Sequence, residues 1–109
     1  MKLAEIYNLL KTTNLPVAYS HFEEGKAPPL PYVVFRLPNS NNFAADGTVY
    51  KAVTALDIEL YTEKKDLATE KKLEDVLNNK IGFYNKLETL VISEKMYQII
   101  YSTEVLIDG

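Results

Sequence analysis

The chain contains no cysteine, no tryptophan and only one histidine, His21. Without cysteine it forms neither disulfides nor thiolate nucleophiles, and zinc sites built on sulfur ligands are excluded. The lone histidine cannot build a multi-histidine metal site, and no serine stands in the strained elbow that a Ser-His-Asp triad requires. We interpret His21 as a partly exposed residue at the end of a strand. The four glycines are scattered and form no phosphate-binding loop, so the sequence predicts no cofactor and no metal.

Long hydrophobic runs and a strong charge of one sign are also missing. No apolar stretch approaches the roughly 20 residues of a membrane span, and the N-terminus lacks the organisation of a signal peptide, so we expect no membrane contact and a cytoplasmic protein. Twelve basic and 15 acidic residues give a net charge of −3. Lysines alternate with glutamates instead of forming a stripe, which argues against specific nucleic-acid binding.

Apolar side chains are plentiful enough for one small folded domain. Hydrophobic residues make up 47% of the 109 residues, which is enough to offset the conformational entropy lost on folding. Two separate halves would each be too small for a stable core. We therefore expect a single domain over residues 1–109.

Two amphipathic helices are predicted from hydrophobic spacing. The first covers residues 2–12, and its apolar face is formed by Leu3, Ile6, Tyr7 and Leu10. Asn14 and Pro16 are residue types that end a helix. The second begins after Asp66, a preferred N-cap type, and runs to residue 79. Its apolar stripe is formed by Leu73, Val76 and Leu77.

Strands are predicted at residues 17–22, 32–37, 48–62, 87–92 and 96–107. Proline-rich residues 23–31 and asparagine-rich residues 39–47 are predicted loops. Between residues 48 and 62 the even positions are mostly apolar and the odd positions carry the charges, which fits an antiparallel sheet covered on one side. The predicted fold is α+β: a two-layer sandwich of a mainly antiparallel sheet of four to five strands with two helices packed on one face.

Asp57 and Glu59 are the best candidates for a chemical site. Residues i and i+2 of a strand share a face, so the two carboxylates could hold a divalent metal or share a proton. Such sites also need a third acid, and the nearest upstream acid, Asp46, has a structural role in a predicted turn. We interpret the pair as a solvated sheet face, and an ion pair between subunits is the other alternative to a metal site.

The predicted loop at residues 39–47 is the best candidate for a contact with another protein. It encloses a small apolar patch in a polar segment that cannot easily fold back onto the core. A plain solvated hairpin loop is the alternative. The candidate interface residues are Asn41, Asn42, Phe43, Ala44, Asp46 and Tyr50.

Several local strings occur together along nearly the whole chain. They are residues 15–19 (LPVAY) with the following Phe22, 31–35 (PYVVF), 45–47 (ADG) before Tyr50, 58–66 (IELYTEKKD) and 93–98 (SEKMYQ). In this order they resemble the small tail-completion proteins of siphophages and of prophages of Gram-positive bacteria. These proteins are also described as tail-terminator or head-to-tail joining proteins.

The resemblance implies a structural protein without enzymatic activity. Such a protein forms a ring, commonly a hexamer, that caps the phage tail tube and joins it to the head-connector complex. Its partners would be other copies of itself, the tail-tube protein and head-connector proteins, at the head–tail junction of the virion and in the host cytoplasm during assembly. DNA would pass through the ring without specific binding, which suits a weakly acidic protein. A monomeric protein-binding adaptor or regulatory module, and a small metal-dependent enzyme using Asp57 and Glu59, remain alternatives.

Overall fold

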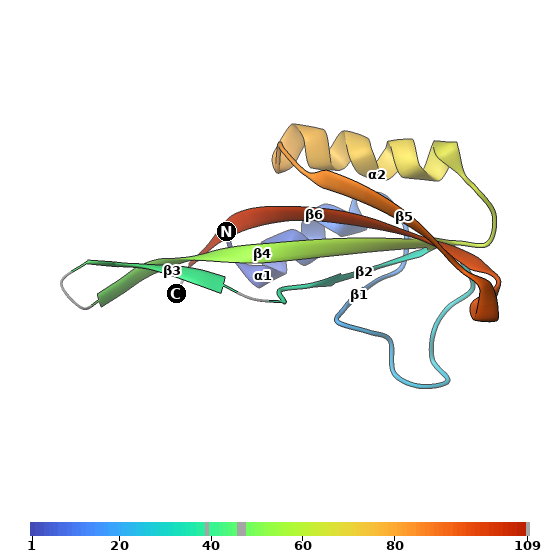
Figure 1. Ribbon diagram of the computed structural model, residues 1–109, viewed down its shortest axis with the longest axis horizontal. Coiled ribbons are helices and arrows are strands. Elements are labelled where there is room, and N and C mark those ends of the chain that lie inside the picture. Colours follow the sequence, from blue (N-terminus) through green and yellow to red (C-terminus); the bar gives the residue numbers. More distant parts are fainter. Residues whose placement is uncertain (39, 46–47, 109) are drawn as a thin grey trace.

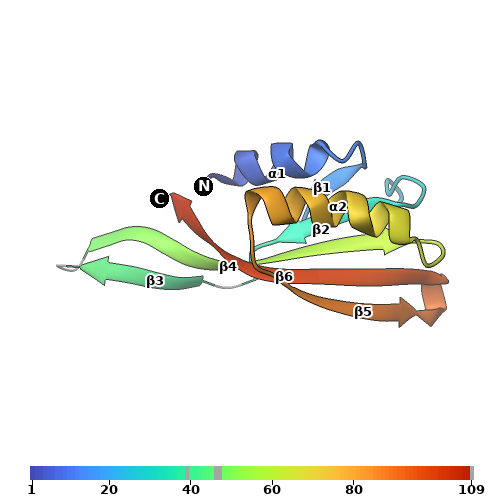
Figure 2. The same ribbon diagram turned by 90° about the horizontal axis from the view of Figure 1, so that it is seen from above.

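Two helices lie on one face of a six-stranded sheet in the computed structural model, which describes residues 1–38, 40–45 and 48–108 (Figure 1, Figure 2). The predicted α+β sandwich of two layers is thereby confirmed. The elements in chain order are α1 (Leu3–Lys11), β1 (Val17–Tyr19), β2 (Tyr32–Arg36), β3 (Ser40–Ala45), β4 (Thr48–Thr62), α2 (Leu67–Lys80), β5 (Asn85–Val91), the 3-10 turn η1 (Ile92–Glu94) and β6 (Met96–Asp108).

The main path across the sheet has the order β1-β2-β4-β6-β5. β1 and β2 are parallel, and the other strand pairs are antiparallel. β2 and β3 both pair with β4, β2 along residues 57–61 and β3 along residues 48–54. They therefore follow one another along the same side of β4, because β6 occupies the other side.

The hydrophobic core lies between the helices and the even-numbered face of β4. Leu56, Ile58 and Leu60 are 0% exposed, as the alternating pattern predicted. Their neighbours across the sheet continue the same apolar face, since Ile58 pairs with Phe35 on one side and Tyr101 on the other. Both of these aromatic residues are also buried.

Each helix covers this core with part of its predicted stripe. Ile6 and Leu10 of α1 are fully buried, whereas Leu3 and Tyr7 are about 40% exposed. Leu73 and Leu77 of α2 are buried in the same core. Asp66 is the N-cap of α2, as predicted, and its Oδ1 accepts a hydrogen bond from the backbone N–H of Thr69 at 3.1 Å.

The interpretation of residues 39–47 as a loop is wrong, because residues 40–45 form β3. Asparagine is uncommon in strands, which is why this segment was predicted to be a loop. However, β4 extends well beyond the end of β2, and β3 pairs with the part of the β4 edge that β2 leaves open. Four strands, and not the three predicted at residues 17–22, 32–37 and 48–62, therefore lie between the helices. β1 is also shorter than predicted and ends at Tyr19, and Ser20 has a positive φ of 68°.

β3 and the adjoining parts of two long strands form a projection that we call the arm. It consists of β3, residues 48–54 of β4, and residues 105–108 of β6, which pair with residues 51–54. β3 and the start of β4 project beyond both helices (Figure 1, Figure 2). The molecule is elongated in consequence, with extents of 50 × 30 × 22 Å. In the described part of the chain, no helix has the length and apolar character to cross a membrane.

Candidate interaction surfaces

The face of the sheet opposite the helices, which we call the open face, carries a polar cluster centred on Glu59. This glutamate is only 6% exposed. Its Oε2 lies 3.2 Å from Nε of Arg36, and its Oε1 accepts hydrogen bonds from Tyr61 Oη at 2.6 Å and from Gln98 Nε2 at 2.9 Å. Residues from β2, β4 and β6 thus meet at one carboxylate.

The interpretation of Asp57 and Glu59 as a solvated pair is therefore wrong for Glu59. Three donors from its own chain surround this carboxylate, and its ion pair is made within the chain. Asp57 is partly buried and accepts a hydrogen bond from the Ser102 hydroxyl at 2.9 Å. No cluster of three or more His, Cys, Asp or Glu side chains suited to a metal occurs within the described residues.

Burial raises the pKa of the Tyr61 hydroxyl, and the hydrogen bond to Glu59 raises this pKa further. The phenol therefore stays protonated at neutral pH and keeps donating to the carboxylate. This hydrogen bond fixes the position of the Tyr61 ring. The centroid of that ring lies 5.3 Å from the ring centroid of Tyr32. The Tyr32 ring in turn packs edge-to-face against Phe22, with a distance of 5.1 Å between the two ring centroids. The aromatic residues line a shallow pocket of about 250 Å³.

His21 lies at the rim of this pocket, two residues beyond the end of β1. It is exposed, whereas the sequence predicted a partly exposed residue at the end of a strand, because β1 already ends at Tyr19. Its Nδ1 lies 3.3 Å from the Ser20 hydroxyl. This contact is with a chain neighbour, so His21 does not take part in the Glu59 cluster.

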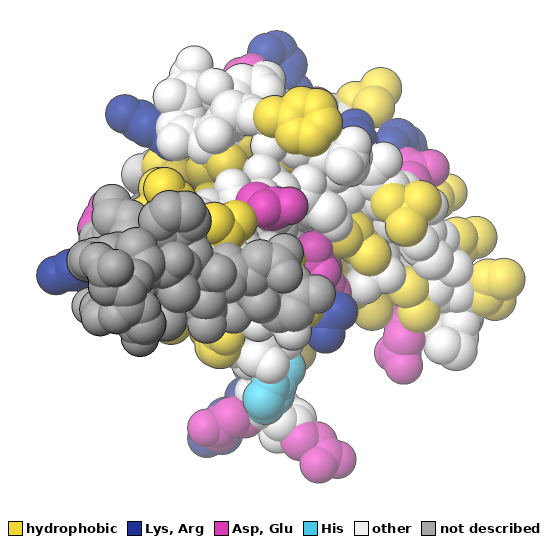
Figure 3. Space-filling view, turned by 60° about the vertical axis from the view of Figure 1, so that its left-hand side comes forward, with side chains coloured by type: hydrophobic (Ala, Val, Ile, Leu, Met, Phe, Trp, Pro, Cys, Tyr) yellow, Lys and Arg dark blue, Asp and Glu magenta, His cyan; other side chains and the backbone are white. Residues whose placement is uncertain are grey.

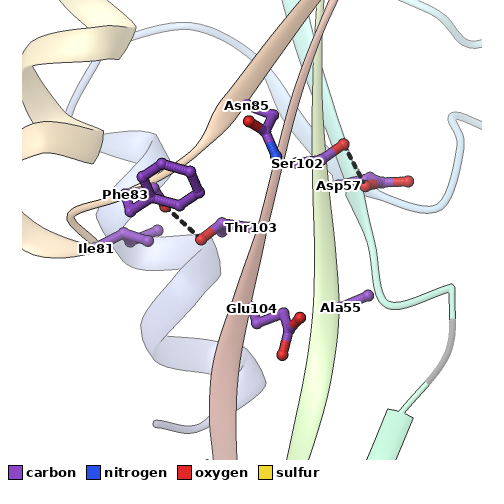
Figure 4. Close-up of a pocket in the computed structure, with 8 residues that line it drawn as sticks. All are labelled: Ala55, Asp57, Ile81, Phe83, Asn85, Ser102, Thr103 and Glu104. Carbon is purple, nitrogen blue, oxygen red and sulfur yellow. Dashed lines mark hydrogen bonds between the residues drawn. The ribbon is translucent and has the colours of Figure 1, made fainter.

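A larger pocket of about 450 Å³ lies where β5 begins beside β6. Ile81 and Phe83 lie on one side of β6 and Ala55 and Asp57 on the other, so the pocket is a notch at the edge of the sheet (Figure 4). The Thr103 hydroxyl donates to the Phe83 carbonyl at 2.5 Å and fixes the turn that enters β5. Beyond this notch β6 continues without β5.

A second polar cluster lies beneath α2 and joins it to the sheet. Glu70 is 2% exposed and forms ion pairs with Lys65 at 2.7 Å and Lys86 at 2.8 Å. Lys86 also pairs with Glu74, which accepts a hydrogen bond from the buried Tyr101 hydroxyl. Burial lowers the pKa of Lys86, but the hydrogen bonds to Glu70 and Glu74 outweigh this and raise it to about 12. The cluster is thus a fixed structural connection.

The predicted interface residues lie in the arm. Asn41, Asn42, Phe43 and Ala44 belong to β3, and Tyr50 belongs to β4. Asp46 lies outside the described residues. Ala45 pairs with Thr48, so β3 and β4 form a hairpin. The structure therefore brings five of the six candidates into one projecting hairpin.

Exposed apolar residues near β5 form a feature that the sequence patterns did not single out. Hydrophobic side chains gather on the right-hand side of the space-filling view (Figure 3). Between residues 83 and 92, four large ones are 52–78% exposed: Phe83, Leu87, Leu90 and Ile92. The apolar, β-rich run at residues 87–92 indicated a strand but could not show that this strand lies at the sheet edge.

Comparison with known proteins gives no assignment. No protein-family model matches the chain, and no curated protein matches it.

Proposed function

We propose that this chain is a structural assembly protein that works as a closed ring of identical copies. The proposal is based on the arm, which projects from the body of the molecule and has, within the described residues, an unpaired β-strand edge on each of its two sides. Among the described strands, β3 pairs only with β4, and β6 beyond Ser102 likewise pairs only with β4. Unpaired strand edges are templates for association with another chain.

A closed ring is the arrangement that uses such edges without fibre growth. Two different edges of one subunit can form a head-to-tail contact, and such contacts produce either a ring or an open filament. Closure pairs each edge with the complementary edge of a neighbour and limits the number of copies. The exposed apolar residues near β5 add surface that a neighbour or a partner would cover.

The local strings that resemble tail-completion proteins give this ring a specific setting. We propose that it caps the tail tube of a siphophage or prophage and joins the tube to the head-connector complex, as a virion component. The net charge of −3 suits a ring through which DNA slides without adhering, because positive charge would hold the phosphates. Six copies are the number that the resemblance supports.

Catalysis is not part of the proposed function. Among the residues whose burial the structure describes, Glu59 and Glu70 are the two most buried carboxylates, and both are paired with cations of their own chain. Such groups stabilise the fold and leave no free base or metal ligand at these positions. The polar clusters therefore support a framework that presents the arm.

Electron microscopy of the purified protein tests this function. At high protein concentration, or on addition of purified phage tails that lack a cap, we expect rings of uniform diameter, on their own or at the tail end. A chain that remains monomeric under both conditions, with bare tails, would show that it is not a tail-completion ring.

A further inference from the structure

We infer that neighbouring copies join edge to edge through the arm, the outer edge of β3 in one copy pairing with residues 103–108 of β6 in the next. This contact rests on the proposed ring and specifies how it is built. The occupant of each free edge is therefore a second copy of the same chain.

The β3 edge and the β6 edge lie on opposite sides of β4, beside the same residues of that strand. Asn41 pairs with Val53, and Val53 pairs with Leu106, so these three residues form one row across the arm. The rows on either side follow the same pattern, with Ser40–Thr54–Val105 and Asn42–Ala52–Ile107. The arm is thus a three-stranded ribbon that a further copy could extend on either side.

The backbone of β6 offers hydrogen-bonding groups on its free side. The Leu106 carbonyl accepts a hydrogen bond from the N-terminal ammonium of Met1 at 2.8 Å, which shows that this carbonyl is accessible. Ser102, four residues earlier, still pairs with Asn85 of β5. Since alternate residues of an antiparallel strand share a side, Glu104 points its N–H and C=O the same way as Leu106. A neighbouring strand at this position would replace the hydrogen bond from the Met1 ammonium to the Leu106 carbonyl.

Residue composition separates these edges from the others. Natural edge strands that must stay unpaired are short or carry charges, especially lysine. β1 has only three residues, and β5 carries Lys86 and Glu88. β3 has six residues and none is charged. The β3 edge of the arm therefore lacks the protection that β1 and β5 have.

Charge also favours pairing between unlike edges. Two β6 edges paired antiparallel about Leu106 would place Glu104 of one copy opposite Asp108 of the other, and like charges directly opposite destabilise a sheet. The uncharged β3 carries no such penalty against β6. A contact between different edges propagates around a ring, whereas a contact between identical edges stops at a dimer.

The direction of this pairing follows from the topology. β3 and β6 both run antiparallel to β4, so they run parallel to each other within a subunit. A ring axis along the arm strands keeps these directions in every copy. β6 of one copy and β3 of the next should therefore pair in parallel.

Engineered cysteines test the contact, since the natural chain has none. The first paired variant combines Asn41→Cys with Leu106→Cys. The second combines Asn41→Cys with Glu104→Cys, in case the two strands pair with a register shifted by two residues. Within one subunit the two strands lie on either side of β4, about 10 Å apart, which exceeds the roughly 7 Å limit for a disulfide. A disulfide must therefore link two copies. On oxidation of the concentrated protein we expect a ladder of covalent multimers in at least one paired variant.

The matched control pairs Asn41→Cys with Thr89→Cys on the β5 edge, and we expect no ladder from it. Single Asn41→Cys protein should give no covalent dimer, because two β3 edges do not meet. A third variant, Glu104→Pro, removes an N–H that faces the free edge, and we expect the folded protein, verified by circular dichroism, to lose the oligomer.

Two results would overturn the inferred contact while leaving the ring itself intact. One is an oligomer that gives no ladder from either paired variant and persists in folded Glu104→Pro protein. The other is an efficient dimer from Asn41→Cys alone, which would mean that identical β3 edges meet. If the unmodified chain forms no oligomer at high concentration or on tails, the proposed function itself fails.

Discussion

Glu59 is a charged residue on the open face of the sheet, yet it is only 6% exposed. Burial of an ionised carboxylate is costly unless hydrogen bonds and an opposite charge compensate. Arg36, Tyr61 and Gln98 supply these contacts from three strands. Glu59 therefore holds β2, β4 and β6 together on the side that no helix covers.

The Glu59→Ala substitution should lower the free energy of unfolding by about 2–3 kcal/mol. Hydrogen bonds to a charged group contribute about 1.5–3 kcal/mol each. The total loss is smaller than their sum, because the donors that remain can partly hydrogen-bond to water. Urea denaturation followed by circular dichroism measures this change. Glu63→Ala is the matched control, since Glu63 is an exposed residue of the turn after β4, and its effect should stay within about 0.5 kcal/mol. Equal effects at the two positions would contradict the role of Glu59.

Glu70 makes stability depend on pH in the acidic range. Burial acts to raise the pKa of its carboxyl, but the hydrogen bonds and charges of Lys65 and Lys86 outweigh this and hold the pKa below its usual value of 4.5. A lowered pKa in the folded state means that the unfolded state binds more protons, so the stabilisation is present above pH 4.5 and is lost as pH falls through the lowered pKa.

Glu70→Gln should therefore be less stable than the unmodified protein by about 1–3 kcal/mol at pH 7. The difference should shrink as pH falls from 6 to 3, because protonated Glu70 loses its ion pairs. Urea denaturation at several pH values measures both proteins. A difference that stays constant over this range would show that the ion pairs of Glu70 do not stabilise the fold.

Sequence pattern alone could not distinguish the environments of Asp57 and Glu59. Both are acidic residues at odd positions of the same strand, and alternation correctly placed both on the open face. Their burial depends on which strands lie beside β4 and on the side chains that those strands carry. Arg36 and Gln98 are far from Glu59 in sequence, so their convergence required the three-dimensional structure.

At the scale of elements, the connection between β5 and β6 contains a strained backbone position. Lys95 follows the 3-10 turn Ile92–Glu94 and has a positive φ of 53°, in the left-handed region. A residue with a Cβ atom is disfavoured there by roughly 1–2 kcal/mol, whereas glycine is not.

Lys95→Gly should therefore raise the free energy of unfolding by about 0.5–1 kcal/mol, after allowance for the greater entropy of glycine in the unfolded chain. Thermal denaturation of the variant measures the change. Glu94→Gly is the control, because Glu94 lies within the 3-10 turn and gains nothing from a glycine, so this variant should be less stable. Destabilisation by Lys95→Gly would show that this position is not strained.

Most elements could be predicted because local signals and tertiary packing agree in them. β4 was predicted with its observed bounds, Thr48–Thr62, and Asp66 correctly marked the start of α2. β3 was missed because its asparagines favour turns, whereas its strand conformation depends on pairing with the part of β4 that β2 does not reach. The parallel β1–β2 pair also depends on a non-local contact.

At the scale of the whole molecule, the helices and both polar clusters belong to a packed body from which the arm projects. β4 and β6 are shared by the two parts, since residues 56–62 of β4 contribute to the body and residues 48–54 to the arm. A neighbour that bound to the arm, as proposed, would therefore contact the same two strands that form the core. This continuity suits a subunit whose arms must hold a fixed angle to close a ring.

The mass of the protein in solution tests the ring most directly. Sedimentation velocity should be measured over a wide concentration range for the unmodified chain and for a variant that lacks residues 41–44, with circular dichroism to verify that the variant is folded. The unmodified chain should pass from a 12.4 kDa monomer to one discrete oligomer, consistent with six copies, while the variant remains a folded monomer. The opposite result, a monomer at every concentration or the same oligomer without residues 41–44, would contradict a ring assembled through the arm.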